Sequence, residues 1–169
     1  NRLHFYLTNQ LEVPSITGDF IPEYINSFEE YEKTTVLRYS EDLAKLNASK
    51  RLLNKPWLNS RGAVIRFDRK AIEIRVLDAQ ECIKSDVALS CFIRALLRGI
   101  LADDQYPHLA HHVLVKDLNE VVKHGLNAYV QNPQGEITRQ VCRHLLLMAT
   151  KNATDEEKKY LPIIKQRIE

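Results

Sequence analysis

Two short runs of alternating side chains, residues 63–68 and 71–78, constrain the fold of this chain more than any other feature. A period of two is typical of a strand with one buried face, and a gap of two residues is typical of an antiparallel hairpin. In the second run one face carries Ile72, Ile74 and Val76, and the other carries Glu73, Arg75 and Leu77. We expect the β-branched face to be buried in a core and the charged face to be open.

The turn between the two runs decides how the strands pair. If Arg69 and Lys70 form a two-residue turn, Arg66 lies directly opposite Glu73, and the polar and apolar faces agree across both strands. Arg-Lys is poor chemistry for the tight turns that hairpins prefer, so a longer loop with another register stays open.

The residues before the hairpin are expected to mix extended and helical structure. Residues 3–7 are strand-like, and Pro14, Gly18 and Pro22 mark a loop after them. Helical spacing then covers residues 25–39 and recurs over 41–53, where it ends in turn signals.

The residues after Asp78 have helical spacing throughout. We expect four helices, over residues 85–101, 109–124, 136–151 and 155–167. Thr154 and Glu157 form the capping-box pattern of a helix start, and Asn132 to Gly135 is a turn by composition. The predicted fold class is α+β, with antiparallel strands in residues 1–80 and a C-terminal helical bundle in residues 81–169 of a single domain.

Composition and charge exclude several classes of protein. The 24 basic and 22 acidic side chains are interspersed, so no basic stripe suits nucleic acid. The longest apolar stretch contains Arg94 and Arg98 and is too short for a bilayer, so we expect no membrane partner. Three cysteines without a CxxC pair indicate neither a disulfide framework nor a zinc site. These features favour a cytoplasmic protein.

Glu73 and Arg75 form the candidate site. Two residues apart on one strand face, they are separated by about 7 Å at roughly 3.3 Å per residue. Carboxylate oxygens suit Mg²⁺, and a guanidinium suits phosphate oxygens, so the pair fits a nucleotide triphosphate. The alternative is that both are exposed strand residues paired with neighbours. Arg66, on the same face, is either a cross-strand partner of Glu73 or a ligand for a substrate carboxylate or phosphate.

Other polar residues have simpler interpretations. Asp78, at the end of the strand, favours a turn or capping role over a ligand role. Arg94, Arg98 and Ser90 share one stripe of an apolar helix, which indicates a solvated or partly buried seam. The chain has no GxxxxGK[ST], GxGxxG, GxSxG or HExxH motif and only five glycines. Any phosphate chemistry must therefore use side chains and metal.

The strand Ala71-Ile-Glu-Ile-Arg-Val-Leu-Asp78 resembles a motif of the glutamate–cysteine ligases and related ATP-dependent carboxylate–amine ligases. The resemblance extends upstream to residues 21–32, with a Pro and an aromatic before an acidic Tyr-Glu helix. Downstream it includes the apolar helix over 87–101 and the segment 124–135 with the Leu-rich helix after it. Most of the chain is therefore covered, in the order of the family.

The resemblance implies an active site on a glutamine-synthetase-like, funnel-shaped antiparallel sheet, where ATP phosphorylates a substrate carboxylate and an amine displaces the phosphate. By position, Glu73 matches the Mg²⁺-binding glutamate and Arg75 the arginine on the ATP phosphates. Arg66 matches, more loosely, an arginine in the preceding strand, which many relatives follow with Pro where this chain has Phe67. The implied cofactors are ATP and Mg²⁺, and the implied partners are an amino-acid carboxylate and an amine.

The family's strand with several metal-binding glutamates has no counterpart in these 169 residues. We therefore expect the chain to be the C-terminal part of a larger enzyme, inactive without the N-terminal half, and open to homo-oligomer formation through exposed sheet edges. A second hypothesis is a non-catalytic binding or accessory domain that keeps the ligase fold. The missing glutamates and Phe67 motivate it.

Overall fold

The structure is a computed structural model of the chain that describes residues 2–9, 16, 20–46, 49, 60–103, 108–132 and 134–169. The chain forms two compact units, Asn1–Leu77 and Asp78–Glu169, and each is described here by itself. The single domain expected for residues 1–169 stays a prediction. The predicted loop at Pro14 and Gly18, and most of residues 47–59, lie outside the described residues.

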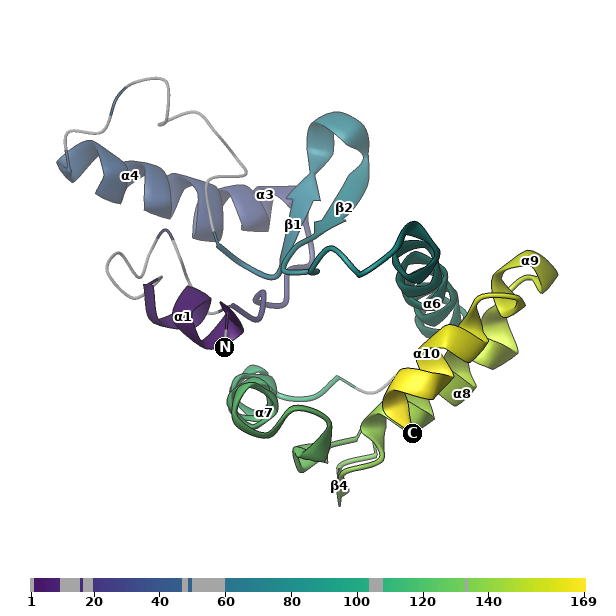
Figure 1. Ribbon diagram of the computed structural model, residues 1–169. Helices are drawn as coiled ribbons and strands as arrows, with labels where there is room; N and C mark the ends of the chain where they lie inside the picture. The colour runs from purple at the N-terminus through teal and green to yellow at the C-terminus, as the bar shows by residue number, and fades with distance from the viewer. Residues whose placement is uncertain are drawn as a thin grey trace. The chain divides into compact units, whose positions relative to one another are not determined.

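The first unit begins with helix α1, Arg2–Asn9, where the sequence predicted a strand (Figure 1). That prediction was wrong because a segment as short as residues 3–7 fits both the two-residue period of a strand and the roughly 3.6-residue period of a helix. Leu3, Tyr6 and Leu7, which are spaced as on one helix face, are partly buried, whereas His4 and Phe5 are exposed. The helical period therefore decides which side chains this segment buries.

One continuous helical stretch follows, made of α3 (Phe28–Tyr31), a π-helical turn (Glu32–Val36) and α4 (Leu37–Lys45). The side chain of Ser27 caps its start by accepting a hydrogen bond from the Glu30 N–H. Four buried residues, each four positions after the last, form its inner stripe: Tyr31, Thr35, Tyr39 and Leu43. The helix predicted over residues 25–39 is confirmed, with a later start and a longer C-terminal end.

The predicted hairpin is present, with strands β1 (Ala63–Arg66) and β2 (Ala71–Ile74) paired antiparallel. The register differs by two residues from the one that a two-residue turn would give. Val64 lies opposite Glu73, and Arg66 lies opposite Ala71. The loop is longer, with a 3-10 turn at Phe67–Arg69 and Lys70 in the left-handed region at φ 50°. This longer loop places one non-glycine residue, Lys70, at positive φ, whereas a type I′ turn would place two residues there.

The burial of the two hairpin faces is opposite to the prediction. Val64, on the face of Glu73, is 2% exposed, whereas Ile72 on the other face is 63% exposed. Alternation shows that a strand has two faces but not which one lies inside, and paired charges can occupy an inner face. Val76 does not continue the apolar face, because β2 ends at Ile74 and Val76 has a φ of 62°.

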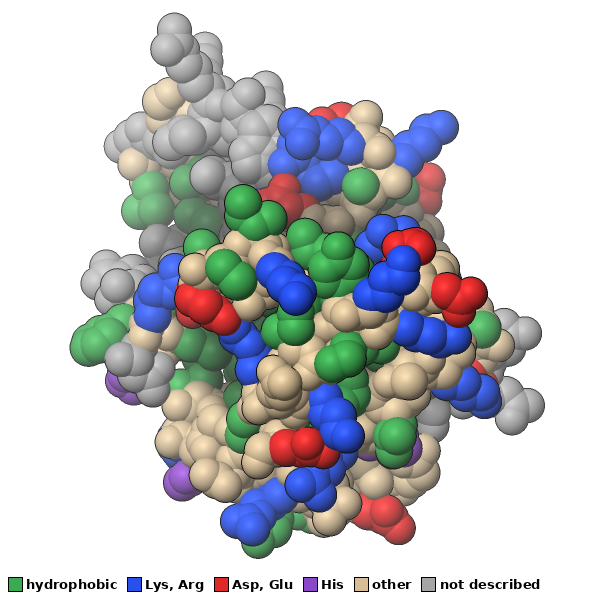
Figure 2. Space-filling view, turned by 45° about the vertical axis from the view of Figure 1, so that its right-hand side comes forward, with side chains coloured by type: hydrophobic (Ala, Val, Ile, Leu, Met, Phe, Trp, Pro, Cys, Tyr) green, Lys and Arg blue, Asp and Glu red, His purple; other side chains and the backbone are tan. Residues whose placement is uncertain are grey.

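The second unit contains α6 (Ile83–Leu101), α7 (His111–His124), α8 (Val141–Asn152), α9 (Asp155–Lys158) and α10 (Leu161–Ile168). Its core is a small cluster of Ala95, Ala149, Ala153 and Leu161. Helices α6 and α8 approach closely at Gly99, where a Cβ atom would lie 2.7 Å from Nδ2 of Asn152. Apolar side chains stay exposed between charged ones on the face in Figure 2.

Most predicted helices of this unit are confirmed, with two differences. The last splits into α9 and α10, and a second hairpin of β3 (Val130–Gln131) and β4 (Ile137–Thr138) precedes α8. The turn predicted near Gly135 joins these strands. The α+β class is confirmed. Among the helices that the structure describes, none has the length and hydrophobicity needed to span a bilayer.

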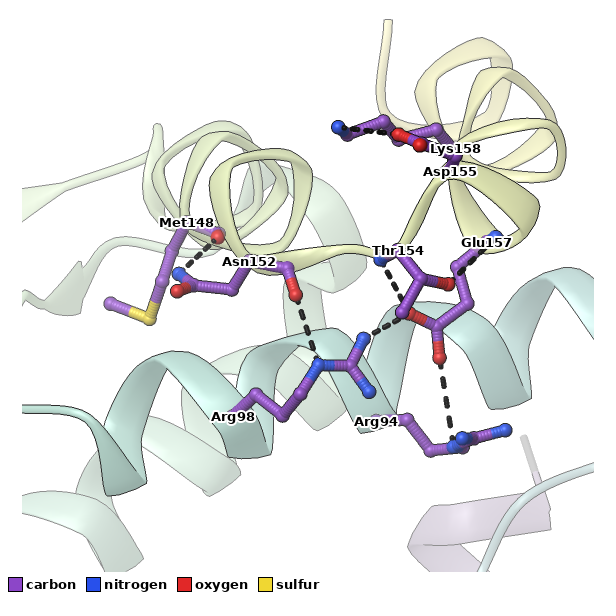
Figure 3. Close-up of polar contacts among 8 residues, drawn as sticks. All are labelled: Arg94, Arg98, Met148, Asn152, Thr154, Asp155, Glu157 and Lys158. Atoms are coloured by element: carbon purple, nitrogen blue, oxygen red, sulfur yellow. Dashed lines mark hydrogen bonds and ion pairs between the residues drawn. The ribbon is translucent and has the colours of Figure 1, made fainter.

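A buried carboxylate joins α6 to the start of α9 (Figure 3). Glu157 is 4% exposed, accepts a hydrogen bond from the Thr154 N–H at 2.9 Å, and pairs with Arg98. Arg98 also donates from Nε to the Asn152 carbonyl at 2.9 Å, at the end of α8. Hydrogen bonds from Thr154 and Arg98 hold the pKa of Glu157 below its usual value. The predicted capping box therefore also ties three helices together.

We expect Glu157→Ala to lower the free energy of unfolding by about 3 kcal/mol, because it leaves a partly buried Arg98 without its counter-charge and removes the capping box. The matched control is Asp155→Ala, which removes an exposed carboxylate paired with Lys158 and costs less than about 1 kcal/mol. Urea unfolding followed by circular dichroism at 222 nm measures both. Equal effects of the two substitutions would contradict the role given to Glu157.

Candidate functional site

The hairpin brings together the three residues that the sequence proposed as a site. Arg66 ends β1, Glu73 lies in β2, and Arg75 follows β2 directly. Nη1 of Arg66 donates to Oε2 of Glu73 at 2.7 Å, and Nε of Arg75 donates to Oε1 at 2.9 Å. We call these three residues the hairpin site.

The register explains how one carboxylate reaches both arginines. Arg66 is diagonal to Glu73 rather than opposite it, a separation that a long side chain can bridge. Arg75 stays on the same face because its N–H donates to the Gly62 carbonyl at 2.7 Å, one step beyond β2. The backbone then turns at Val76, whose left-handed φ is uncommon for a β-branched residue.

Aromatic packing fixes the loop beside the hairpin site. The ring of Phe67 lies edge-on to Phe28, with centroids 4.1 Å apart, and 5.6 Å from the ring of Tyr31. Phe67, which the sequence marked as a departure from the family pattern, thus attaches the loop to α3. Next to it, Asp68 accepts a 3.4 Å hydrogen bond from Nε of Arg66, which gives Arg66 a second carboxylate partner.

A second arginine–carboxylate pair lies at the start of β1, and sequence reasoning missed it. Nε and Nη2 of the buried Arg61 each bond an oxygen of Glu23 at 2.5 Å. This bidentate geometry fixes both partners more tightly than a single contact does. The two residues are 38 positions apart in the sequence, and no spacing pattern could reveal the pair. Glu23 lies in the segment 21–32 that contributed to the family resemblance.

The two arginines keep Glu73 ionised. Hydrogen bonds from Arg66 and then Arg75 are the main causes that lower the pKa of Glu73, and the bond that Arg66 donates to Glu73 raises the pKa of Arg66. Glu73 remains 38% exposed, so water and ligands reach the carboxylate. With Asp68 beside Arg66, two positive and two negative charges lie together here.

The donor set suits a metal ion only together with phosphate. Among the residues that the structure describes, no three His, Cys, Asp or Glu side chains lie close enough to hold a metal ion. Mg²⁺ keeps several waters and binds through one or two carboxylates plus substrate phosphates. Glu73 fits as one such carboxylate, and the neighbouring guanidiniums fit the phosphates. The same guanidiniums oppose a bare cation.

The other polar candidates, Asp78, Arg94 and Arg98, belong to the second unit. Arg98 is partly buried in the contact with Glu157, as predicted for the seam, whereas Arg94 is mostly exposed and lies 3.6 Å from the same carboxylate. The Asp78 carbonyl accepts a hydrogen bond from the Gln80 side chain at 2.7 Å. This contact places Asp78 in the connection before α6.

Comparison with known proteins identifies the family. The family described as Glutamate-cysteine ligase family 2 matches residues 1–169, the whole length of the chain. The chain belongs to this family. The match confirms the resemblance that the strand around Glu73 and Arg75 indicated.

A relative in the same comparison is an uncharacterized protein of Archaeoglobus fulgidus. It is 42% identical over 168 residues, which cover 99% of this chain and 41% of the relative. The chain therefore spans less than half the length of that relative. No solved structure matches the chain. Family membership supports a ligase in general, and the roles of Arg66, Glu73 and Arg75 stay predictions.

We expect the Glu73 carboxyl to titrate below its ordinary value of 4.5, because both arginines favour the ionised form. A depressed folded-state pKa means that these ion pairs stabilise the hairpin above the unfolded value and are lost as pH falls through the folded value. Carboxyl ¹³C NMR between pH 2 and 7 measures the midpoint.

Arg66→Gln should move that midpoint upward, because the bond from Arg66 is the largest cause of the shift. The control is Arg69→Gln, since Arg69 pairs with Asp68 and not with Glu73. A midpoint at or above 4.5 in the unsubstituted protein would contradict the ion-pair geometry.

Proposed function

We propose that the chain is part of an ATP- and Mg²⁺-dependent carboxylate–amine ligase. In the proposed reaction ATP phosphorylates a substrate carboxylate, and an amine attacks the acyl phosphate to form an amide and release phosphate. The observation that carries the proposal is the hairpin site, where an ionised carboxylate lies between two guanidiniums in a chain of the glutamate–cysteine ligase family.

Each residue of the hairpin site has a role in this proposal. Glu73 would supply one carboxylate oxygen to Mg²⁺, which neutralises phosphate charge when bound. Arg75 would bind the ATP phosphates, because a guanidinium keeps its charge and offers a planar set of donors. Arg66 would bind a phosphate or the substrate carboxylate. The contacts with Glu73 hold both arginines in place before substrate arrives, which lowers the cost of ordering them.

The substrates and partners of the whole protein belong to the same proposal. They are an amino-acid carboxylate, an amine, and an N-terminal half that would provide further carboxylates for the metal. The exposed Ile72 face of the hairpin is compatible with a contact to that N-terminal half or to a second copy of the chain. The free thiols of Cys82, Cys91 and Cys142 support a cytoplasmic protein.

One observation favours a second function, a non-catalytic domain that keeps the ligase fold. Both oxygens of Glu73 already accept hydrogen bonds from arginines within the hairpin. Such a closed set of ion pairs also serves as a purely structural contact between the strands. The two proposals differ in whether Glu73 meets a metal–nucleotide complex.

Glu73→Gln in the full-length protein should lower the rate of phosphate release from ATP by about 100-fold or more, because the neutral amide loses the charge that a metal ligand needs. The assay follows phosphate with amino-acid pairs as substrates. Asp68→Asn is the matched control, since it removes a carboxylate from the same loop and the other partner of Arg66 while leaving Glu73 in place. Full activity of Glu73→Gln would overturn the metal role.

Calorimetric titration with MgATP separates the ligase from the accessory domain. The ligase predicts Mg²⁺-dependent binding to the full-length protein that weakens at least about tenfold in Arg75→Gln, which loses a charge-assisted hydrogen bond. It also predicts weak binding to residues 1–169 alone, where no three described His, Cys, Asp or Glu side chains lie close enough to hold a metal ion. The accessory domain predicts no Mg²⁺-dependent binding to either protein.

A further inference from the structure

The second unit contains a pocket that the proposed ligase chemistry does not use. It has a volume of about 440 Å³ and lies among the 3-10 turn Gly125–Asn127, strand β4, the first turn of α8 and the end of α10. Among its lining residues are two arginines, Arg139 and Arg143, which lie four positions apart where α8 begins.

The two arginines carry positive charge that this part of the fold does not balance. Across the described residues 108–132 and 134–169, no Asp or Glu lines the pocket, and neither arginine forms an ion pair. The guanidinium of Arg139 instead lies 5.2 Å from the ring centroid of Tyr129, a cation–π contact that fixes its position and leaves its charge uncompensated. Most surface arginines of this unit, by contrast, contact a carboxylate, as Arg94, Arg98 and Arg167 do.

The backbone adds to the positive potential of the pocket. No side chain caps the start of α8, and its first turn carries no acidic residue. The N–H groups of such a turn point out of the helix and attract anions. Cys142 and Arg143 both belong to this turn and line the pocket together with Arg139, so the start of the helix borders the same space as the two arginines.

We propose that this pocket binds a small organic phosphate, with its phosphate group between Arg139 and Arg143 at the start of α8. Two guanidiniums and a helix N-terminus are the donors that phosphate oxygens prefer. The volume exceeds that of a phosphate ion, and the apolar side chains of Leu126, Ile137 and Ile168 line the rest, so an organic group has room beside them. The proposal is independent of the hairpin site and of the ligase reaction.

The test is a titration of the protein with phenyl phosphate, inorganic phosphate and phenol, followed by ¹H–¹⁵N NMR shifts of residues 126–143. Phenyl phosphate should bind with a dissociation constant in the millimolar range or below, more tightly than inorganic phosphate, and phenol should not bind. Arg143→Gln and Arg139→Gln should each weaken phenyl phosphate about tenfold, because each removes a charge-assisted contact.

Two control substitutions keep the result specific to the pocket. Arg38→Gln removes one positive charge from an exposed position on α4 in the other unit and should leave binding unchanged. Glu73→Gln should also leave it unchanged, so loss of ligase activity and loss of this binding remain distinguishable. Binding of phenyl phosphate that survives both pocket substitutions, or no binding in the millimolar range, would overturn the proposal. Equal affinity for inorganic phosphate would overturn the organic-phosphate part.

Discussion

The contact of Glu73 with Arg66 and Arg75 is the interaction on which the first unit depends. It lies on the more buried face of a hairpin whose strands have only four residues each. A two-stranded hairpin is marginal by itself in water, so its conformation requires contacts beyond the ladder. The Arg66–Glu73 pair supplies one across the strands, the Glu73–Arg75 pair runs along β2 and its continuation, and the ring of Phe67 supplies one to α3. The same contacts fix the charged groups that a phosphate ligand would meet.

The placement of charges on the inner face has a consequence for how the hairpin tolerates change. Arg66 and Arg75 each have most of their side chain removed from water, so an arginine without a carboxylate partner would be costly there. Glu73 therefore has a structural role whatever its role toward a metal ion. This is why the effect of a substitution at Glu73 on activity has meaning only beside a measure of folding and beside a neighbouring carboxylate.

The sequence predicted elements better than it predicted their placement. Helices with long periodic patterns were found, and Thr154 with Glu157 marked a helix start because a capping box is local. The hairpin register was off by two because it depends on loop conformation, and a shift by two preserves which side chains share a face. The strand expected at residues 3–7 was wrong because so short a segment fits two periods. The pairs Arg61–Glu23 and Arg98–Glu157 join residues far apart in sequence, and no spacing rule reports them.

The candidate site was predictable although the hairpin register was not. Glu73 and Arg75 share a strand face in any register, so their proximity follows from a period of two. The diagonal position of Arg66 arises only from the four-residue loop, yet its guanidinium still reaches the carboxylate, because a long side chain can bridge a shift of two residues. A site built from long charged side chains on one face of a hairpin is thus less sensitive to register than an apolar core. In the proposed ligase, this tolerance would let the loop sequence vary, as Phe67 does here, while the charges stay together.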